Sequence, residues 1–299
     1  MISVSTIVNI IVGGLIYASL LFLLSSGLSL ILGVMRIINL VHASFYSLGA
    51  YLAIWLCKSI LGYTSNMLIL VAALVIAGLF ISIIGLGIEV SVLRPIYRRA
   101  EEYQIILTFG IVMCFIGIIK LVFGMEPKYI TEVYMGFGSI DIAGATLPLY
   151  DFLVIGAAFA VAILLWAILT KTFTGKVIRA VAERRDVAEA LGINSGRVMT
   201  VTYTIGAALA GLSGSLTIPI FTAIPGMGVE LLVLAFVVVA TGGAGSVLGS
   251  FIASLMIGLI RSIGIWLFPE IELAIVVLIM VIVLIVRPAG LFGRELIRR

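Results

Sequence analysis

Three polar side chains lie close together in the otherwise apolar stretch RIINLVHASFYSLGAY, residues 36–51; they are Arg36, Asn39 and His42. Polar groups at membrane depth are costly unless they face a cavity, a partner or the interior of a helix bundle. An interrupted helix exposes its backbone only along a path, and the ends of half-helices carry partial charges that suit a zwitterion. The stretch therefore predicts a solute pathway.

Glu230 joins this predicted pathway at its outer mouth, and Arg261 is a weaker candidate that could simply pair with an acid. A second interpretation of the first three residues stays open. In it, Arg36 anchors the chain at the cytoplasmic surface, and Asn39 and His42 bridge helices.

One long charged segment, RAVAERRDVAEALGINSGRV at residues 179–198, lies between two apolar blocks. At helical spacing its apolar residues fall on one side, and most of its charges fall on the other. Arg179 with Glu183, and Arg185 with Glu189, are i, i+4 pairs that each stabilise a helix by a few tenths of a kcal/mol. The pattern predicts one amphipathic helix.

Gly192 stands where a glycine would end this helix, and Arg184 projects from the middle of its apolar face. An apolar face with a central arginine predicts docking on a soluble partner; the alternative is a solvated loop in which Arg184 lies over apolar neighbours. The predicted docking residues are Val181, Arg184, Val187, Ala188, Gly192 and Ile193.

A glycine cluster, TGGAGSVLGS at residues 241–250, separates two apolar runs. It follows no predicted strand and has no acid at the ribose-binding distance, which disfavours a nucleotide fingerprint. We predict a cytoplasmic turn where helices pack closely, or a hinge, because adjacent glycines weaken a helix by about 1 kcal/mol each. The residues concerned are Gly242, Gly243, Gly245 and Gly249.

Enzyme chemistry is not predicted. His42 is the single histidine, and Cys57 and Cys114 have no metal-ligand spacing and suit packing. TGKVIRA, residues 174–180, lacks the upstream glycine and the Ser or Thr of a phosphate-binding loop. We expect no cofactor, no metal and no nucleic acid, and any energy source must lie on another protein.

The elements that position these residues are membrane spans. The 299 residues are 63% hydrophobic and 11% charged, with a mean hydropathy of +1.34. This composition predicts an all-α polytopic membrane protein with one domain over residues 1–299. Roughly eight to ten spans are expected, because residues 7–57 can be divided in more than one way. The predicted spans are 7–34, 40–57, 67–93, 105–124, 150–170, 198–217, 227–242, 247–267 and 271–286.

Basic residues gather in three connections: Arg94 to Arg99, Lys171 to Arg197, and Arg287 to Arg299. The positive-inside rule places these connections in the cytoplasm, including a cytoplasmic loop at about 171–197. The opposite loops carry acids such as Glu132. The C-terminus is then cytoplasmic, and the N-terminus is outside if the number of spans is odd.

Four stretches in the same order resemble the permease subunits of ATP-binding-cassette importers for branched-chain amino acids. They are GLSLILGVMRIINLVHASFYSLGAYLA, GKVIRAVAERRDVAEALGINSGRVMTVTYTIGAALAGLSGSL, AFVVVATGGAGSVLGSFIASLMIGL and RPAGLFG. The resemblance covers nearly the whole chain.

The resemblance implies a cell-membrane subunit that forms half of a translocation pathway and pairs with a second permease. It also implies two cytoplasmic ATP-binding subunits, an extracytoplasmic substrate-binding protein and a fold related to the vitamin B12 importer permease. ERRDVAEALGI, residues 183–193, matches the part that contacts the ATPase. Urea, short amides or aromatic carboxylates are alternative solutes. An ion-coupled secondary transporter is a further alternative, although it has no evident need for a capped cytoplasmic helix.

Overall fold

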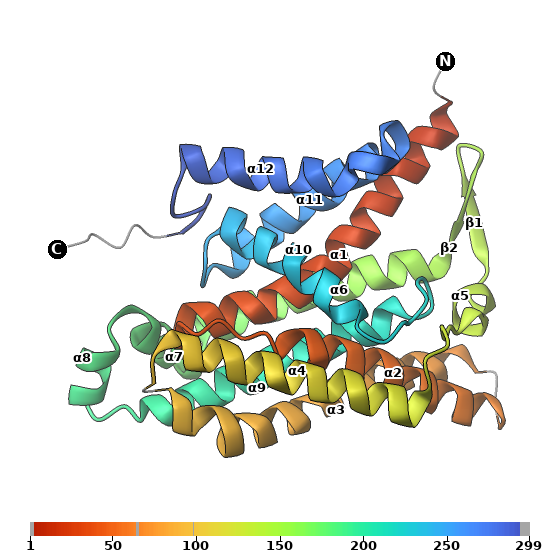
Figure 1. Ribbon diagram of the computed structural model, residues 1–299. Coiled ribbons are helices and arrows are strands. Elements are labelled where there is room, and N and C mark those ends of the chain that lie inside the picture. Colours follow the sequence, from red (N-terminus) through yellow and green to blue (C-terminus); the bar gives the residue numbers. More distant parts are fainter. Residues whose placement is uncertain (1–2, 64–65, 98, 294–299) are drawn as a thin grey trace.

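The computed structural model describes residues 3–63, 66–97 and 99–293. Helices dominate this part of the chain, together with one small antiparallel hairpin (Figure 1). In chain order the elements are α1 (Val4–Met35), α2 (His42–Leu61), α3 (Met67–Ile88), the π-helix η1 (Glu89–Leu93), the 3-10 helix η2 (Arg94–Ile96), α4 (Glu101–Phe123), α5 (Thr131–Gly136), β1 (Ser139–Ile142), β2 (Ala145–Pro148), α6 (Leu149–Lys171), α7 (Phe173–Glu183), α8 (Arg185–Ala190), α9 (Ser195–Thr217), α10 (Met227–Gly242), α11 (Val247–Leu267), the 3-10 helix η3 (Pro269–Ile271) and α12 (Glu272–Val286).

Within the described residues, eight helical segments are long and apolar enough to cross a bilayer. α10, with 16 residues, is a ninth, shorter apolar helix. The prediction of an all-α polytopic membrane protein with roughly eight to ten spans is therefore confirmed. The ambiguous region 7–57 is two helices, α1 and α2, separated by residues 36–41.

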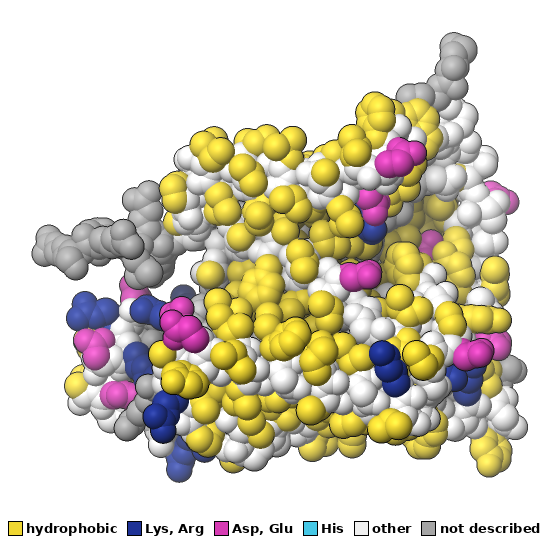
Figure 2. Space-filling view, viewed as in Figure 1, with side chains coloured by type: hydrophobic (Ala, Val, Ile, Leu, Met, Phe, Trp, Pro, Cys, Tyr) yellow, Lys and Arg dark blue, Asp and Glu magenta, His cyan; other side chains and the backbone are white. Residues whose placement is uncertain are grey.

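The two ends of the molecule differ in charge. α7 and α8 lie at one end, and the hairpin, α5 and the start of α1 lie at the other (Figure 1). Lys and Arg gather mainly at the α7–α8 end, and hydrophobic side chains cover the broad surface between the ends (Figure 2). This distribution matches the positive-inside rule, so we assign the α7–α8 end to the cytoplasm. The start of α1 is then outside. Arg294, Arg298 and Arg299 of the predicted basic tail lie outside the described residues.

α9 is the central helix, and it packs on α1, α2 and α3 through glycines. An added Cβ on Gly206 would lie 2.6 Å from Cδ1 of Ile31, and one on Gly211 would lie 2.7 Å from Cβ of Ile81. A Cβ on Gly49 of α2 would lie 2.7 Å from the Cα of Gly211. Such contacts are typical of transmembrane helices, which approach closely where the residues are small.

We predict that Gly211→Ala destabilises the bundle, because the added methyl group overlaps Gly78 and Ile81 of α3. Overpacking of this kind costs about 1–3 kcal/mol. The melting temperature of the detergent-solubilised protein should fall. The matched control is Gly156→Ala in α6, where an added Cβ meets no atom within 4 Å. Equal effects of the two substitutions would contradict the packing described for α9.

Topology is tested with single cysteines at Asp186→Cys and Glu132→Cys, in a background in which Cys57 and Cys114 are replaced. Both positions are exposed, and they lie in α8 and α5 at opposite ends of the molecule (Figure 1). A membrane-impermeant thiol reagent added to intact cells should label position 132 and spare position 186. Labelling of both from one side would overturn the orientation.

Candidate functional site

A cavity of about 210 Å³, called here the outer cavity, opens between α1, α2, α9, α10 and α11. Part of its wall is the connection from α9 to α10, in which Ala223 bridges to Lys128 in the outer loop after α4. The apolar part of the wall includes Leu20, Leu24, Phe221, Ile224, Met227 and Leu231. Hydrophobic walls with a few polar groups are usual for small-molecule sites.

Arg261 and Glu230 bring charge to the outer cavity. Arg261 donates to Oε1 of Glu272 at 2.9 Å, and its guanidinium carbon lies 3.9 Å from the centre of the Tyr17 ring. The Arg261 and Glu272 side chains are each 20% exposed. Glu230 lies in the first turn of α10, where the helix dipole favours an acid. The structure thus places Glu230 in the wall, and it pairs Arg261 with an acid outside the wall.

Asn39 and His42 are fully buried and are not part of the outer cavity. Nε2 of His42 lies 2.9 Å from the carbonyl oxygen of Leu24 in α1, and the hydroxyl of Tyr203 in α9 donates to Oδ1 of Asn39 at 3.5 Å. These contacts bridge helices. Both residues nevertheless lie near the cavity, because Leu24 lines it and Tyr46, one helical turn after His42, also lines it.

Residues 36–41 return into the bundle before α2 begins. His42, the first residue of α2, contacts Leu24, which lies eleven residues before the end of α1. At 1.5 Å per residue this contact is about 16 Å from the cytoplasmic end of α1. The predicted interruption of the helix is therefore present, and it places the start of α2 within the membrane.

Arg36 does not join Asn39 and His42. It is exposed and follows the last residue of α1 with a φ of +55°. Its guanidinium donates to the carbonyl oxygen of Ala182, near the end of α7, at 3.2 Å. A cation near the last carbonyls of a helix interacts favourably with the helix dipole. Arg36 therefore connects α1 to the cytoplasmic loop. This contact supports the interpretation of Arg36 as an anchor rather than as a residue of the solute pathway.

The predicted single amphipathic helix is broken at Arg184. α7 ends at Glu183 and α8 begins at Arg185, and Arg184 has the extended dihedrals φ −143° and ψ 86°. The prediction of one continuous helix is wrong at this residue. The spacing of apolar residues in the sequence gives no information on tertiary contacts, and such contacts decide where a helix ends. Here the hydroxyl of Ser195 at the start of α9 donates to the carboxylate of Glu189, which ties α8 to the next span.

The end of α8 is closed as predicted. Gly192 has a φ of +83°, a conformation that favours glycine. The N–H of Gly192 donates to the carbonyl of Glu189, and the N–H of Ile193 donates to that of Ala188, each at 3.0 Å. These two bonds form a Schellman motif. The predicted ion pair of Arg185 and Glu189 is present at 2.9 Å.

The predicted docking residues divide into two groups. Val181 and Ala188 are buried within this chain, and Ile193 packs partly against the same core. Arg184 and Val187 are exposed. Leu191 was on the apolar side of the predicted helix but not in the docking set; its side chain is 78% exposed. Arg184 lies 3.5 Å from Asp186 and lowers the pKa of that carboxyl.

The glycine cluster is a turn in which backbones touch. Gly242 ends α10, Gly243 and Gly245 have positive φ, and Gly249 in α11 lies against Gly242. The Gly245 N–H donates to Oγ of Ser29 in α1 at 3.1 Å. The RPAGLFG stretch closes the turn, because the Leu291 and Phe292 N–H groups donate to the carbonyls of residues 241 and 242. The turn is as predicted; a hinge stays a prediction.

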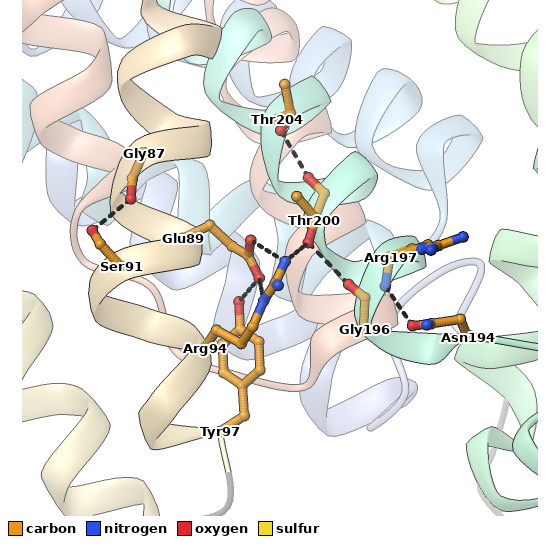
Figure 3. A network of polar contacts seen from close by, with 10 residues as sticks. All are labelled: Gly87, Glu89, Ser91, Arg94, Tyr97, Asn194, Gly196, Arg197, Thr200 and Thr204. Carbon is orange, nitrogen blue, oxygen red and sulfur yellow. Dashed lines mark hydrogen bonds and ion pairs between the residues drawn. The ribbon is translucent and has the colours of Figure 1, made fainter.

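A second polar site, called here the Glu89 network, was not predicted. Glu89, fully buried, accepts from the guanidinium of Arg94 at 3.2 Å and from the hydroxyl of Tyr97 at 2.8 Å (Figure 3). Arg94 also donates to the hydroxyl of Thr200 in α9. The network fixes the cytoplasmic end of α3 to the first turns of α9. An acid inside the predicted span 67–93 was the available signal.

The backbone changes form at this network. Glu89 begins the π-helix η1, and Pro95 follows in η2. Proline has no N–H to donate to residue 91 and disturbs the preceding turn, which accounts for the end of the α-helix here. Burial, and the hydrogen bond to Glu89, raise the pKa of Tyr97 well above its usual range. The phenol therefore stays protonated and donates.

The fold and both ends of the molecule are those of a membrane transport subunit, with a cavity on the outer side and an exposed helical loop on the cytoplasmic side. The family model for "Branched-chain amino acid transport system / permease component" matches residues 10–286. The chain belongs to this family and is a multi-pass permease subunit of the cell membrane. Membership in this family of importer permeases implies ATP-binding and substrate-binding partners.

Similar proteins span nearly the same length. The high-affinity branched-chain amino acid transport system permease protein BraD of Pseudomonas aeruginosa is 27% identical over 95% of both chains. LivH of Escherichia coli K12, a permease protein of the same description, is 25% identical over 94% of both chains. The ribose import permease protein RbsC of Escherichia coli K12 is 26% identical over 76% of this chain and 71% of its own.

These relatives are transport permeases rather than catalytic proteins. No solved structure matches the chain. The expected relation to the vitamin B12 importer permease therefore stays a prediction.

The Glu89 network predicts a specific pattern of stability. Arg94→Gln leaves the buried Glu89 carboxylate without its cation, which costs about 1–3 kcal/mol or more for a charged group. The double variant Glu89→Gln with Arg94→Gln removes the unpaired charge and should recover part of the loss. Thermal unfolding of the purified variants measures this. No difference between the single and double variants would argue against the ion pair.

Proposed function

We propose that the chain forms half of a translocation pathway that imports branched-chain aliphatic amino acids. The observation that carries this proposal is the family match over residues 10–286. In the proposed complex the chain acts as one permease domain beside a second permease. Two cytoplasmic ATP-binding subunits hydrolyse ATP, and an extracytoplasmic protein delivers the solute. The apolar wall of the outer cavity supports an aliphatic solute over urea or a short amide.

The cytoplasmic loop supports the proposed ATP-binding partners. Phe173 and Leu191 are 81% and 78% exposed, and Val187, in the α8 helix before Leu191, is exposed as well. The helices α7 and α8 lie at the end of the molecule that is assigned to the cytoplasm (Figure 1), and Leu191 directly follows α8. Exposed apolar groups that gather on one short loop indicate a protein contact. We therefore assign the docking surface to the exposed apolar residues of this loop, which are Phe173, Val187 and Leu191.

The cytoplasmic loop is connected to the bundle at both of its ends by the chain itself, and at two further points by hydrogen bonds. α7 follows α6, and its last turn is tied to the end of α1 by Arg36. α8 leads into α9 and is tied to its first residue through Glu189 and Ser195. α1 and α9 both line the outer cavity, with Leu24 and Thr217 among their contributions. The two helices are the proposed path of coupling.

Transport in proteoliposomes tests the solute and the energy source together. The complete complex with its binding protein should take up radiolabelled leucine, isoleucine and valine only when ATP is present on the cytoplasmic side. Urea and benzoate serve as comparison solutes. Uptake of urea or benzoate in place of leucine would favour the alternative solutes. Uptake driven by an ion gradient without ATP would favour a secondary transporter.

We predict that Leu191→Asp weakens ATPase docking by about 30-fold, because a well-packed interface anchor contributes about 2 kcal/mol or more. Arg184→Glu should have a smaller effect, since Arg184 is exposed and pairs locally with Asp186. Arg185→Gln is the control: it lies in the adjacent helix α8 and pairs with Glu189 within that helix. The measurement is retention of the ATP-binding subunits during purification. Full retention by Leu191→Asp would place the docking surface elsewhere.

A further inference from the structure

The wall of the outer cavity contains one negatively charged and one positively charged side chain. Of its lining residues, Glu230 and Arg261 are the two that are charged at neutral pH, and they come from different helices, α10 and α11. None of the ion pairs among the described residues includes Glu230. Most amino-acid solutes are zwitterions at neutral pH and present one group of each sign. The wall therefore has complementary charges for both ends of such a solute.

Arg261 has hydrogen-bond donors that its ion pair with Glu272 does not use. A guanidinium group has five N–H donors in a planar fork. Glu272 accepts from Nη2 of Arg261, and the buried Nε has no partner among the described residues. The Tyr17 ring lies against the face of the guanidinium, at 3.9 Å, which fixes its plane and leaves its edge available. Carboxylates are bound by such an edge, often through two parallel hydrogen bonds.

The size and the apolar part of the cavity limit the solute. A volume of about 210 Å³ lies below the roughly 300–1,000 Å³ that is usual for drug-sized ligands. Leu20, Leu24 and Met227 form an apolar wall from α1 and α10. A small solute with an aliphatic side chain fits this combination, whereas a sugar would place hydroxyl groups against the apolar wall.

We propose that the outer cavity is a binding site for a zwitterionic aliphatic amino acid, in which Arg261 holds the carboxylate and Glu230 holds the ammonium group. Tyr17 positions Arg261, and Leu20, Leu24 and Met227 receive the aliphatic side chain. This inference rests on the proposed function and adds the residues that recognise the solute. Urea would use neither charge, and an aromatic carboxylate would use Arg261 alone.

A competing explanation is that Arg261 and Glu272 only tie α11 to the start of α12. The two explanations differ for Glu272, which is not in the wall of the cavity. If the pair is only a tie, Glu272→Gln and Arg261→Gln break it equally. If Arg261 binds the solute carboxylate, Glu272→Gln leaves the binding group in place and removes a competing acceptor.

The test uses the complete complex in proteoliposomes, with radiolabelled leucine supplied by its binding protein. Loss of a charged hydrogen-bonding partner should lower leucine uptake about tenfold or more for Arg261→Gln and for Glu230→Gln. Glu272→Gln should keep uptake. The double variant Arg261→Gln with Glu272→Gln leaves no unpaired charge, so it guards against misfolding of the single variant, and it should lose uptake as well. Retention of the ATP-binding subunits should stay normal in all four, which shows that the complex still assembles.

Each result decides the question. Normal leucine uptake by Arg261→Gln and Glu230→Gln overturns the inference and leaves the proposed function standing. Equal losses in Glu272→Gln and Arg261→Gln also overturn it, because Arg261 is then a tie between helices. If the unmodified complex takes up no branched-chain amino acid, the proposed function fails and the inference fails with it.

Discussion

Backbone contact between α9 and its neighbours is the constraint on which the other features depend. Lipid is as apolar as the side chains of the spans, so helices in a membrane associate through close packing and hydrogen bonds rather than through the hydrophobic effect. Gly206 and Gly211 give α9 this close approach to α1, α2 and α3. Ser213 adds a hydrogen bond to the carbonyl of Leu20, at 2.7 Å. The position of α9 then fixes Thr217 at the outer cavity and Ser195 at the cytoplasmic loop.

The polar residues inside the bundle follow from the same packing. Most buried Ser and Thr hydroxyl groups donate to a carbonyl three or four residues earlier in their own helix, so they need no partner across the interface. Glu89 cannot do this, and it accepts instead from Arg94 in η2 and from Tyr97 directly after it, while Arg94 also donates to Thr200 in α9. Nδ2 of Asn39 and Nδ1 of His42 have no partner among the described residues. An unpaired polar atom in a membrane bundle is costly, and contact of Asn39 or His42 with a solute stays a prediction.

Sequence reasoning predicted the spans well and the contacts between them poorly, for a physical reason. A span is visible in sequence because a side chain in lipid must be apolar, and the backbone must form its hydrogen bonds within the same helix. α3 and α12 are examples. Gly192 was also predictable, since the chain ends a helix there with its own backbone. The break at Arg184, the contact of Arg36 with Ala182 and the Glu89 network depend on residues far apart in sequence. Periodicity carries no information on such pairs.

α9 connects the two functional ends of the proposed importer, and its surface suits that task. Glycine contacts pack tightly, yet they lack the interlocking side chains that resist sliding of one helix along another. The cytoplasmic end of α9 is held more firmly: Thr200 contacts Arg94, and Ser195 contacts Glu189. In the proposed importer, we therefore expect a displacement of α8 to move α9 as a whole rather than to be absorbed at its first turn. Because Thr217 lies in the cavity wall, such a displacement would change the shape of the outer cavity.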